Sequence, residues 1–186
     1  MPIILQHKVQ LTISRERATK LGDYRNAHGG SNHRISINGN LNPYAFLVTL
    51  LHELAHLLAF EQYGNRIAPH GLEWKYIYGQ VLIQFLRQGI FPPDVAAELY
   101  ATMHNPGAST CAEPGLQRVL RNYDVQIEGI KLIEQLAEGQ HFKIPGGRTF
   151  VKGQKLRKRI KCFEWPSMKP YLFSAIYEVL EVEKTG

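Results

Sequence analysis

The chain has 186 residues, of which 44% are hydrophobic, and it carries a formal net charge of +6. This length and composition fit one domain with a sizeable core, or one domain with a small appendage, and they exclude a disordered chain. No run approaches the roughly 18 apolar residues of a membrane span and no signal peptide is visible, so we expect a cytoplasmic protein that does not enter a membrane.

The first forty residues predict strands. Apolar and polar residues alternate over residues 9–13 and again over 34–38, which is the pattern of half-buried strands. The polar, glycine-containing segment 26–33 between them predicts a loop, in which His28 and His33 are expected to be solvated. We expect the strand at 34–38 to lie at the edge of its sheet, where it can pair with an extended peptide.

A helix is predicted to begin after Asn42. Asparagine is a favourable N-cap, Pro43 suits the first turn, and apolar residues recur at spacings of three and four up to Leu58 without an internal Gly or Pro. His52 and His56 are four residues apart in this segment. On a helix they project from one face about one turn apart, so both imidazoles can reach a single ion.

The residue between these histidines adds a possible base to the metal ligands. His52, Glu53 and His56 form the pattern H-E-x-x-H, in which two imidazoles bind zinc and the carboxylate takes a proton from the metal-bound water. Burying an apolar helix is ordinary, whereas burying two histidines within it requires a reason. The pattern therefore predicts a zinc site with Glu53 as the base.

The third zinc ligand is not fixed by this motif. The residues after His56 lack the Gly and His of the metzincin extension, which excludes that class of peptidase. We favour His70, because it lies just ahead of a second predicted helix, from where its side chain can turn back toward the first. Glu61 and Glu73 are the alternatives, since zinc also accepts carboxylate oxygen and a His-His-Glu site is established for catalytic zinc.

A family resemblance is carried by the zinc helix and the segments around it, namely residues 21–25, 35–38, His52, Glu53, His56, His70-Gly71 and Trp74-Lys75. Over residues 5–105 the chain resembles the SprT-like (Spartan-type) zinc metallopeptidase domain. The resemblance implies an α+β fold, a small zincin-like domain of helices packed on a short antiparallel sheet. It also implies one zinc ion per chain, held by His52, His56 and His70, with Glu53 as the catalytic base.

Two more helices are predicted before residue 105. The first runs from Leu72 to near Gly89, and Trp74 on its apolar stripe is expected to belong to the core. The second begins at Pro92-Pro93 and ends near Met103. The first of these helices is expected to brace the zinc site.

The composition changes after this point, and we divide the chain into a metallopeptidase domain (1–105), a connector (106–128) and a small basic β domain (129–186). Short apolar runs separated by turn residues predict a small antiparallel sheet or barrel in the last segment. The related family often continues into a four-cysteine zinc ribbon, but this chain has only Cys111 and Cys162. We therefore expect a β domain, ribbon-like at most, without metal and with reduced thiols.

Positive charge is concentrated in this last segment. Residues 141–186 contain ten Lys or Arg and four Glu, which accounts for the whole net charge. Alternation over 156–162 predicts a strand with Arg157, Arg159 and Lys161 on one face, spaced by roughly 6 to 7 Å, as a phosphate backbone requires. Further cations are expected to contribute, namely Lys152, Lys155 and Lys158. A lysine-rich edge strand that resists aggregation is the alternative.

Two functions remain in view. The first is a zinc endopeptidase acting on protein substrates, which by the family resemblance could be proteins attached to DNA. The second is a DNA-binding module whose metal site is structural or vestigial. Structural zinc is usually closed by four cysteine-rich ligands, whereas three ligands beside a Glu leave a position for water, so the enzyme is favoured. The residue that stabilises the oxyanion is not identified by its position; Tyr24, Arg25 and Tyr63 are candidates by their chemistry.

Overall fold

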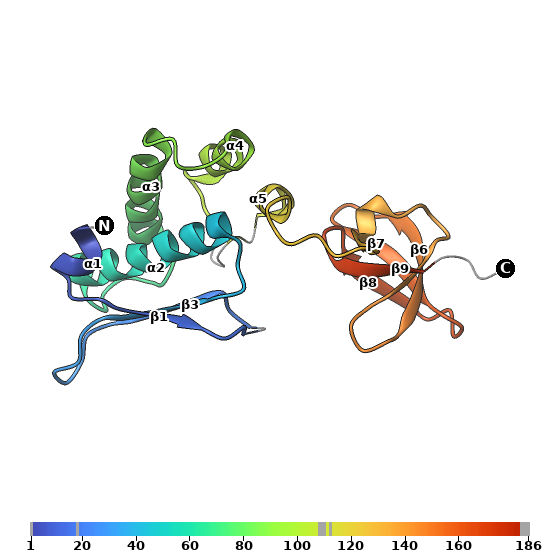
Figure 1. Ribbon diagram of the computed structural model, residues 1–186, viewed down its shortest axis with the longest axis horizontal. Helices are drawn as coiled ribbons and strands as arrows, with labels where there is room; N and C mark the ends of the chain where they lie inside the picture. The colour runs from blue at the N-terminus through green and yellow to red at the C-terminus, as the bar shows by residue number, and fades with distance from the viewer. Residues whose placement is uncertain (1, 18, 108–110, 112, 183–186) are drawn as a thin grey trace. The chain divides into compact units, whose positions relative to one another are not determined.

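The computed structural model describes residues 2–17, 19–107, 111 and 113–182. The chain divides into two compact units, Met1–Asp124 and Val125–Gly186 (Figure 1), and each unit has its own hydrophobic core. The fold is mixed: the first unit is largely helical with a small sheet, and the second is built on a curled antiparallel sheet.

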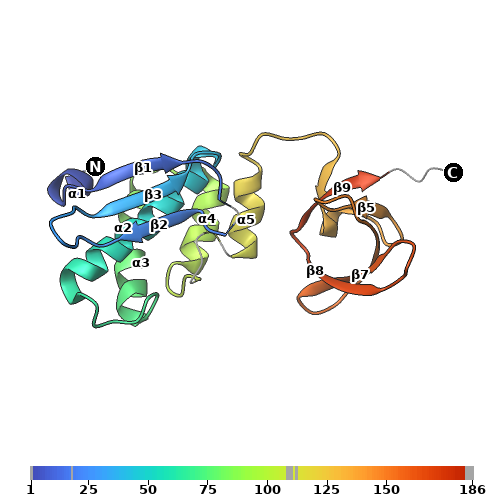
Figure 2. The ribbon, with the colours of Figure 1, turned by 90° about the horizontal axis from the view of Figure 1, so that it is seen from below.

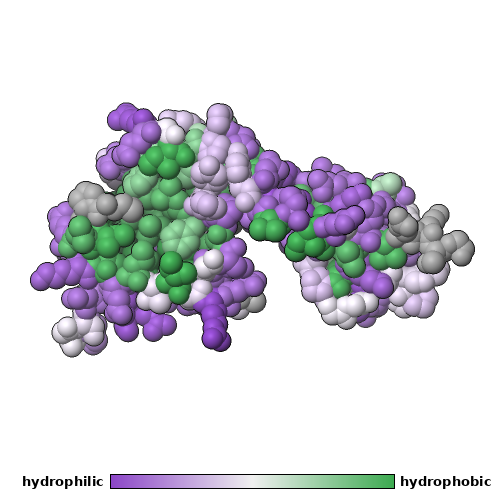
Figure 3. All heavy atoms as spheres, viewed as in Figure 1, coloured by the Kyte–Doolittle hydropathy of each residue, from purple (hydrophilic) through white to green (hydrophobic). Residues whose placement is uncertain are grey.

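The first unit consists, in chain order, of α1 (Pro2–Gln6), β1 (Gln10–Ser14), β2 (Gly22–Arg25), β3 (Arg34–Asn38), α2 (Pro43–Tyr63), α3 (Leu72–Arg87), α4 (Pro93–Thr102) and α5 (Pro114–Arg121). α2 lies between two layers, with the sheet on one side and α3 on the other (Figure 1). The three predicted helices are confirmed as α2, α3 and α4, whereas the short helix α1 was not predicted. Hydrophobic residues cover much of the face over α2 and α3 that Figure 3 shows.

α2 begins at the predicted cap. The Asn42 side-chain oxygen accepts hydrogen bonds from the backbone N–H groups of Tyr44 (3.0 Å) and Ala45 (2.9 Å), which satisfies two donors at the helix start. By length and composition this helix could cross a membrane, but 61% of its apolar window is buried inside the unit. Its apolar character is therefore that of a core helix packed on both sides.

The sheet corrects two expectations. Its order is β1-β3-β2, and β1 runs parallel to β3 while β2 runs antiparallel, so the sheet is mixed rather than antiparallel. β3, with Ile35 and Ile37 buried, is the central strand rather than an edge. Both of its sides are already paired, so it cannot take up an extended peptide. The edges of the sheet are β1 and β2.

α5 belongs to the first unit. Leu116 and Leu120 are buried in its core, and the Asn42 side-chain amide donates to the Leu120 carbonyl at 3.0 Å. The first unit therefore extends to Asp124, whereas the sequence had assigned residues 106–128 to a connector. The apolar spacing within this short, Pro- and Gly-flanked helix was the available indication of its burial.

The second unit consists of β4 (Ile130–Leu132), the 3-10 helix η1 (Ile133–Gln135), β5 (His141–Lys143), β6 (Thr149–Lys155), β7 (Arg159–Glu164), β8 (Pro170–Ser174) and β9 (Glu178–Val182). The six strands pair antiparallel in the order β4-β9-β5-β6-β7-β8 and curl around a core that includes Phe142 and Phe150 (Figure 2). Cys162 is free and buried in that core. Within the described part of this unit, no cluster of metal-binding side chains occurs.

Candidate metal centre

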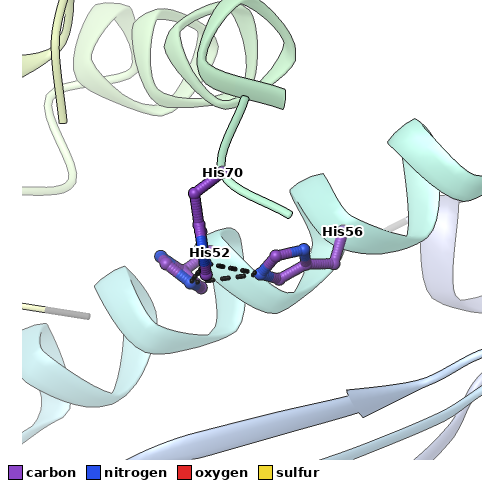
Figure 4. Close-up of side chains that lie close together, drawn as sticks. All are labelled: His52, His56 and His70. Carbon is purple, nitrogen blue, oxygen red and sulfur yellow. Dashed lines mark hydrogen bonds between the residues drawn. The ribbon is translucent and has the colours of Figure 1, made fainter. Parts of the chain in front are cut away.

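Three histidines converge in the first unit. His52 and His56 project from α2, and His70 reaches them from the segment that precedes α3 (Figure 4). The Nε2 atoms are 3.1 Å apart for His52 and His70, 3.3 Å for His52 and His56, and 3.0 Å for His56 and His70. The four-residue spacing on α2 and the turn before α3 thus bring three ring nitrogens to one point.

This spacing fits a metal ion. A tetrahedral zinc with Zn–N bonds of about 2.0 to 2.1 Å holds its ligand nitrogens about 3.3 to 3.4 Å apart, close to the observed 3.0 to 3.3 Å. Among the described residues, no fourth His, Cys, Asp or Glu joins the cluster. The three side chains could therefore hold an ion and would leave part of its coordination sphere open.

The protonation of the cluster also suits a cation. Burial, together with the charges of the neighbouring histidines, lowers the pKa of His52 to about 3 and that of His56 to about 4. Burial and the positive charge of Lys75 lower the pKa of His70. All three imidazoles are therefore neutral near pH 7, which is the form that binds a metal.

His70 reaches the cluster through an unusual backbone conformation. Its φ is +60°, in the left-handed region that residues other than glycine adopt rarely. The bend lies in a tight turn closed by a hydrogen bond of 3.0 Å from the Gly71 N–H to the Ala68 carbonyl. Such conformations occur preferentially at functional sites, where the surrounding structure maintains them.

Glu53 is buried and directly follows His52 in α2. Its carboxylate is hydrogen-bonded to the backbone N–H of Tyr24 in β2. Burial, and then the negative charge of Asp23, raises the pKa of Glu53 to about 7. A carboxyl group with this pKa can both accept and release a proton near neutral pH.

Gly22 is the residue of this site that the sequence did not reveal. A Cβ atom at Gly22 would lie 2.5 Å from Oε1 of Glu53 and 2.7 Å from Cγ2 of Thr49. β2 therefore lies directly against the Glu53 carboxylate at a point where only glycine fits. A glycine within a strand is the one sequence feature that could have indicated such a close approach.

Aromatic rings enclose the three histidines. The Trp74 ring centroid lies 4.7 Å from that of His52, 5.0 Å from that of His56 and 4.6 Å from that of His70. Tyr78 stacks on Trp74 at 5.0 Å. Trp74 is buried, as expected for a core residue. It also packs against the three histidines, which the sequence analysis had not predicted.

Only one of the three oxyanion candidates lies beside a histidine of the cluster. The Tyr24 ring is parallel to the His56 ring with a centroid distance of 6.4 Å. Arg25 instead donates to the Asp23 carboxylate at 3.1 Å. The Tyr63 hydroxyl accepts a hydrogen bond from the neighbouring Gln62.

The other candidate ligands lie outside the cluster. The Glu61 carboxylate lies 3.2 Å from the His33 ring and 3.4 Å from the His7 ring, and Glu73 is exposed. The expectation that His33 is solvated is wrong, because its ring is buried and lies 2.9 Å from the Tyr24 hydroxyl. The alternation of apolar and polar residues over 34–38 gave no indication that His33, just before it, points inward.

The predicted cationic strand is only partly present. β7 begins at Arg159, so Arg157 and Lys158 lie in the turn between β6 and β7 rather than on the strand. Arg159 is exposed and Lys161 half-buried, while the strand positions between and after them point into the core. Lys152 is buried, and its ammonium group donates to the backbone carbonyls of Glu134 and Leu136. Lys152 is therefore an internal residue and not part of a surface for phosphates.

Comparisons with known proteins agree with the position of this centre. Residues 4–94 match the model of the SprT-like family. Over 66 residues the chain is 41% identical to Protein SprT of Yersinia pestis and of Yersinia pseudotuberculosis serotype O:1b (strain IP 31758), covering 31% of this chain and 38% of either relative. Over 63 residues it is 40% identical to Protein SprT of Escherichia coli O1:K1 / APEC, covering 27% and 38%.

These matches have a limited extent. The chain covers 38% of the length of the relatives it matches, and the second unit lies beyond the family match. No solved structure matches this chain. The resemblance found in the sequence is confirmed over residues 4–94, a range that contains all three histidines of the cluster.

Proposed function

We propose that the first unit, whose residues 4–94 belong to the SprT-like family, is a zinc-dependent endopeptidase. The observation that carries this proposal is the convergence of three imidazole nitrogens, 3.0 to 3.3 Å apart, at a helix in which the buried Glu53 directly follows His52. A zinc ion bound there would polarise a peptide carbonyl and lower the pKa of a bound water.

The number of ligands favours catalysis over a structural role. Structural zinc sites usually have four protein ligands, whereas catalytic sites keep one position for water or substrate. His52, His56 and His70 would hold the ion, and no fourth ligand joins them among the described residues. This argument weighs against the alternative of a DNA-binding module with a structural or vestigial metal site.

Glu53 would act as the general base and then as the acid. It takes a proton from the water that attacks the peptide carbonyl, and it delivers this proton to the amide nitrogen as the C–N bond breaks. A pKa near 7 supports both steps. The Tyr24 N–H binds the carboxylate, and the missing side chain of Gly22 leaves room for it against β2.

The free edge of β2 is suited to bind the substrate. Among the described strands, β2 pairs only with β3, and its residue Tyr24 contacts both Glu53 and His56. An extended peptide added to this edge would run past the base and the histidines. We assign to β2 the role that the sequence analysis had assigned to β3.

A second candidate function, contact with DNA, rests on the second unit. Cross-strand pairing puts Arg159 opposite Ser174 and Lys161 opposite Leu172 on the outward face of β7 and β8. No carboxylate occupies an outward position on these two strands. Such a surface suits a phosphate backbone, and with it the protein substrates would be those associated with DNA. The proposed location in the cytoplasm is compatible with this role.

Metal dependence tests the peptidase proposal. The full chain, purified, loaded with one equivalent of zinc and incubated with an unfolded protein substrate, should cleave it. A chelator should abolish cleavage, and added zinc should restore it. Cleavage that survives complete removal of metal would contradict the proposal.

A further inference from the structure

A pocket of about 320 Å³ adjoins the cluster of three histidines. His56 and Trp74 line it on the side of the cluster, and Phe60, Ile67 and Ala68 form other parts of its wall. Because His56 and Trp74 line the pocket and also belong to or contact the histidine cluster, a group bound in the pocket would lie next to that cluster.

The lining has a definite chemistry. Most of it is apolar or aromatic, two asparagines add polar groups, and no Lys, Arg, Asp or Glu lines it. A charged side chain entering it would lose hydration without gaining a counter-charge, which is costly. An apolar side chain would instead be stabilised by its removal from water.

The pocket is large enough to hold a side chain. At about 320 Å³ it lies at the lower end of the range of about 300 to 1,000 Å³ that is typical of small-molecule sites. Tyr24 lines it as well and belongs to β2. In a peptide paired with this strand, alternate side chains point to the same side, so one of them would meet the pocket.

We propose that this pocket binds the side chain of a substrate residue adjacent to the scissile bond and selects a large apolar or aromatic one. The inference rests on the proposed peptidase function and adds a substrate class to it. Ala68 is a small, exposed residue at the wall and leaves room for such a side chain.

Cleavage kinetics test this selectivity. The zinc-loaded chain is given peptides that differ only in one residue flanking the bond, with Phe, Leu, Ala, Asp or Lys at that position. The burial gain predicts that kcat/KM for Phe or Leu exceeds that for Asp or Lys by about 10-fold or more at one of the two flanking positions. In Ala68→Phe the preference should fall to within about threefold. Ala97→Phe on the exposed side of α4 is the matched control and should keep the preference.

Fluorescence gives a readout that does not depend on turnover. The chain has two tryptophans, so Trp165→Phe leaves Trp74, which lines the pocket, as the only reporter. Addition of a Phe-containing tetrapeptide amide should change its emission, an Asp-containing one should not, and Ala68→Phe should remove the response.

The outcomes separate the two proposals. Cleavage without a preference, or a preference that Ala68→Phe leaves unchanged, would overturn the proposal for the pocket. Either result would leave the peptidase proposal standing. A selective fluorescence response in zinc-loaded protein that cleaves no peptide would support the pocket and reject the peptidase. If the protein shows neither cleavage nor a selective fluorescence response, both proposals are wrong.

Discussion

Gly22→Ala provides a stringent perturbation of the site, because it acts on the base without touching a metal ligand. The added Cβ would lie 2.5 Å from Oε1 and 2.9 Å from Cγ of Glu53, where ordinary contacts are 3.4 to 4 Å. Gly22 is fixed by its pairing with Ile37 of β3, so the Glu53 side chain must move by about 1 Å. A misplacement of this size can cost about 10²-fold in rate.

We therefore expect kcat/KM for peptide cleavage to fall by about 100-fold in Gly22→Ala, with one zinc still bound per chain. Alanine is no worse than glycine in a strand, so unfolding is not expected from propensity. Gly39→Ala is the matched control: its Cβ would meet Cγ2 of Ile13 at 2.7 Å, but Ile13 is exposed and can move. Wild-type turnover in Gly22→Ala, or an equal loss in Gly39→Ala, would refute the reasoning.

Two further predictions concern the metal and the second unit. His70→Ala should lose most of the zinc measured by elemental analysis, whereas Glu73→Gln should keep it; the opposite result would identify a His-His-Glu site. Replacing Arg159 and Lys161 together by Gln should weaken duplex DNA binding and reduce the slope of log affinity against log salt by up to about 1.8, at about 0.9 per phosphate contact. Lys131→Gln, which removes a charge already paired with a carboxylate, is the control. An equal effect of Lys131→Gln on DNA binding would reject the assignment of DNA contact to Arg159 and Lys161.

Local features of the site could be predicted from the sequence. The cap at Asn42, the apolar spacing and the interval between His52 and His56 all depend on residues within one helix, where sequence distance determines spatial distance. These features agree with α2 as observed. The meeting of His70 with α2 was also expected, because the chain turns back immediately before the next helix.

Features that depend on distant segments could not be predicted in this way. Alternation marks a strand but not its neighbours, so the central position of β3 and the edge position of β2 were missed. The contact of Gly22 with Glu53 joins segments about thirty residues apart and leaves only a glycine in the sequence as a trace. Lys152 was expected on the surface because lysine is rarely buried, yet backbone carbonyls bind its ammonium group inside the second unit.

The most direct measurement of the central claim is the comparison of zinc-loaded wild type with Glu53→Gln. Glutamine keeps the shape of the side chain but cannot accept the proton of the attacking water. We predict one zinc per chain in both proteins and a loss of peptide cleavage by about 10² to 10⁴-fold in the variant, the usual contribution of general acid-base catalysis. Glu53→Gln that binds zinc and cleaves peptide at the wild-type rate would contradict the account.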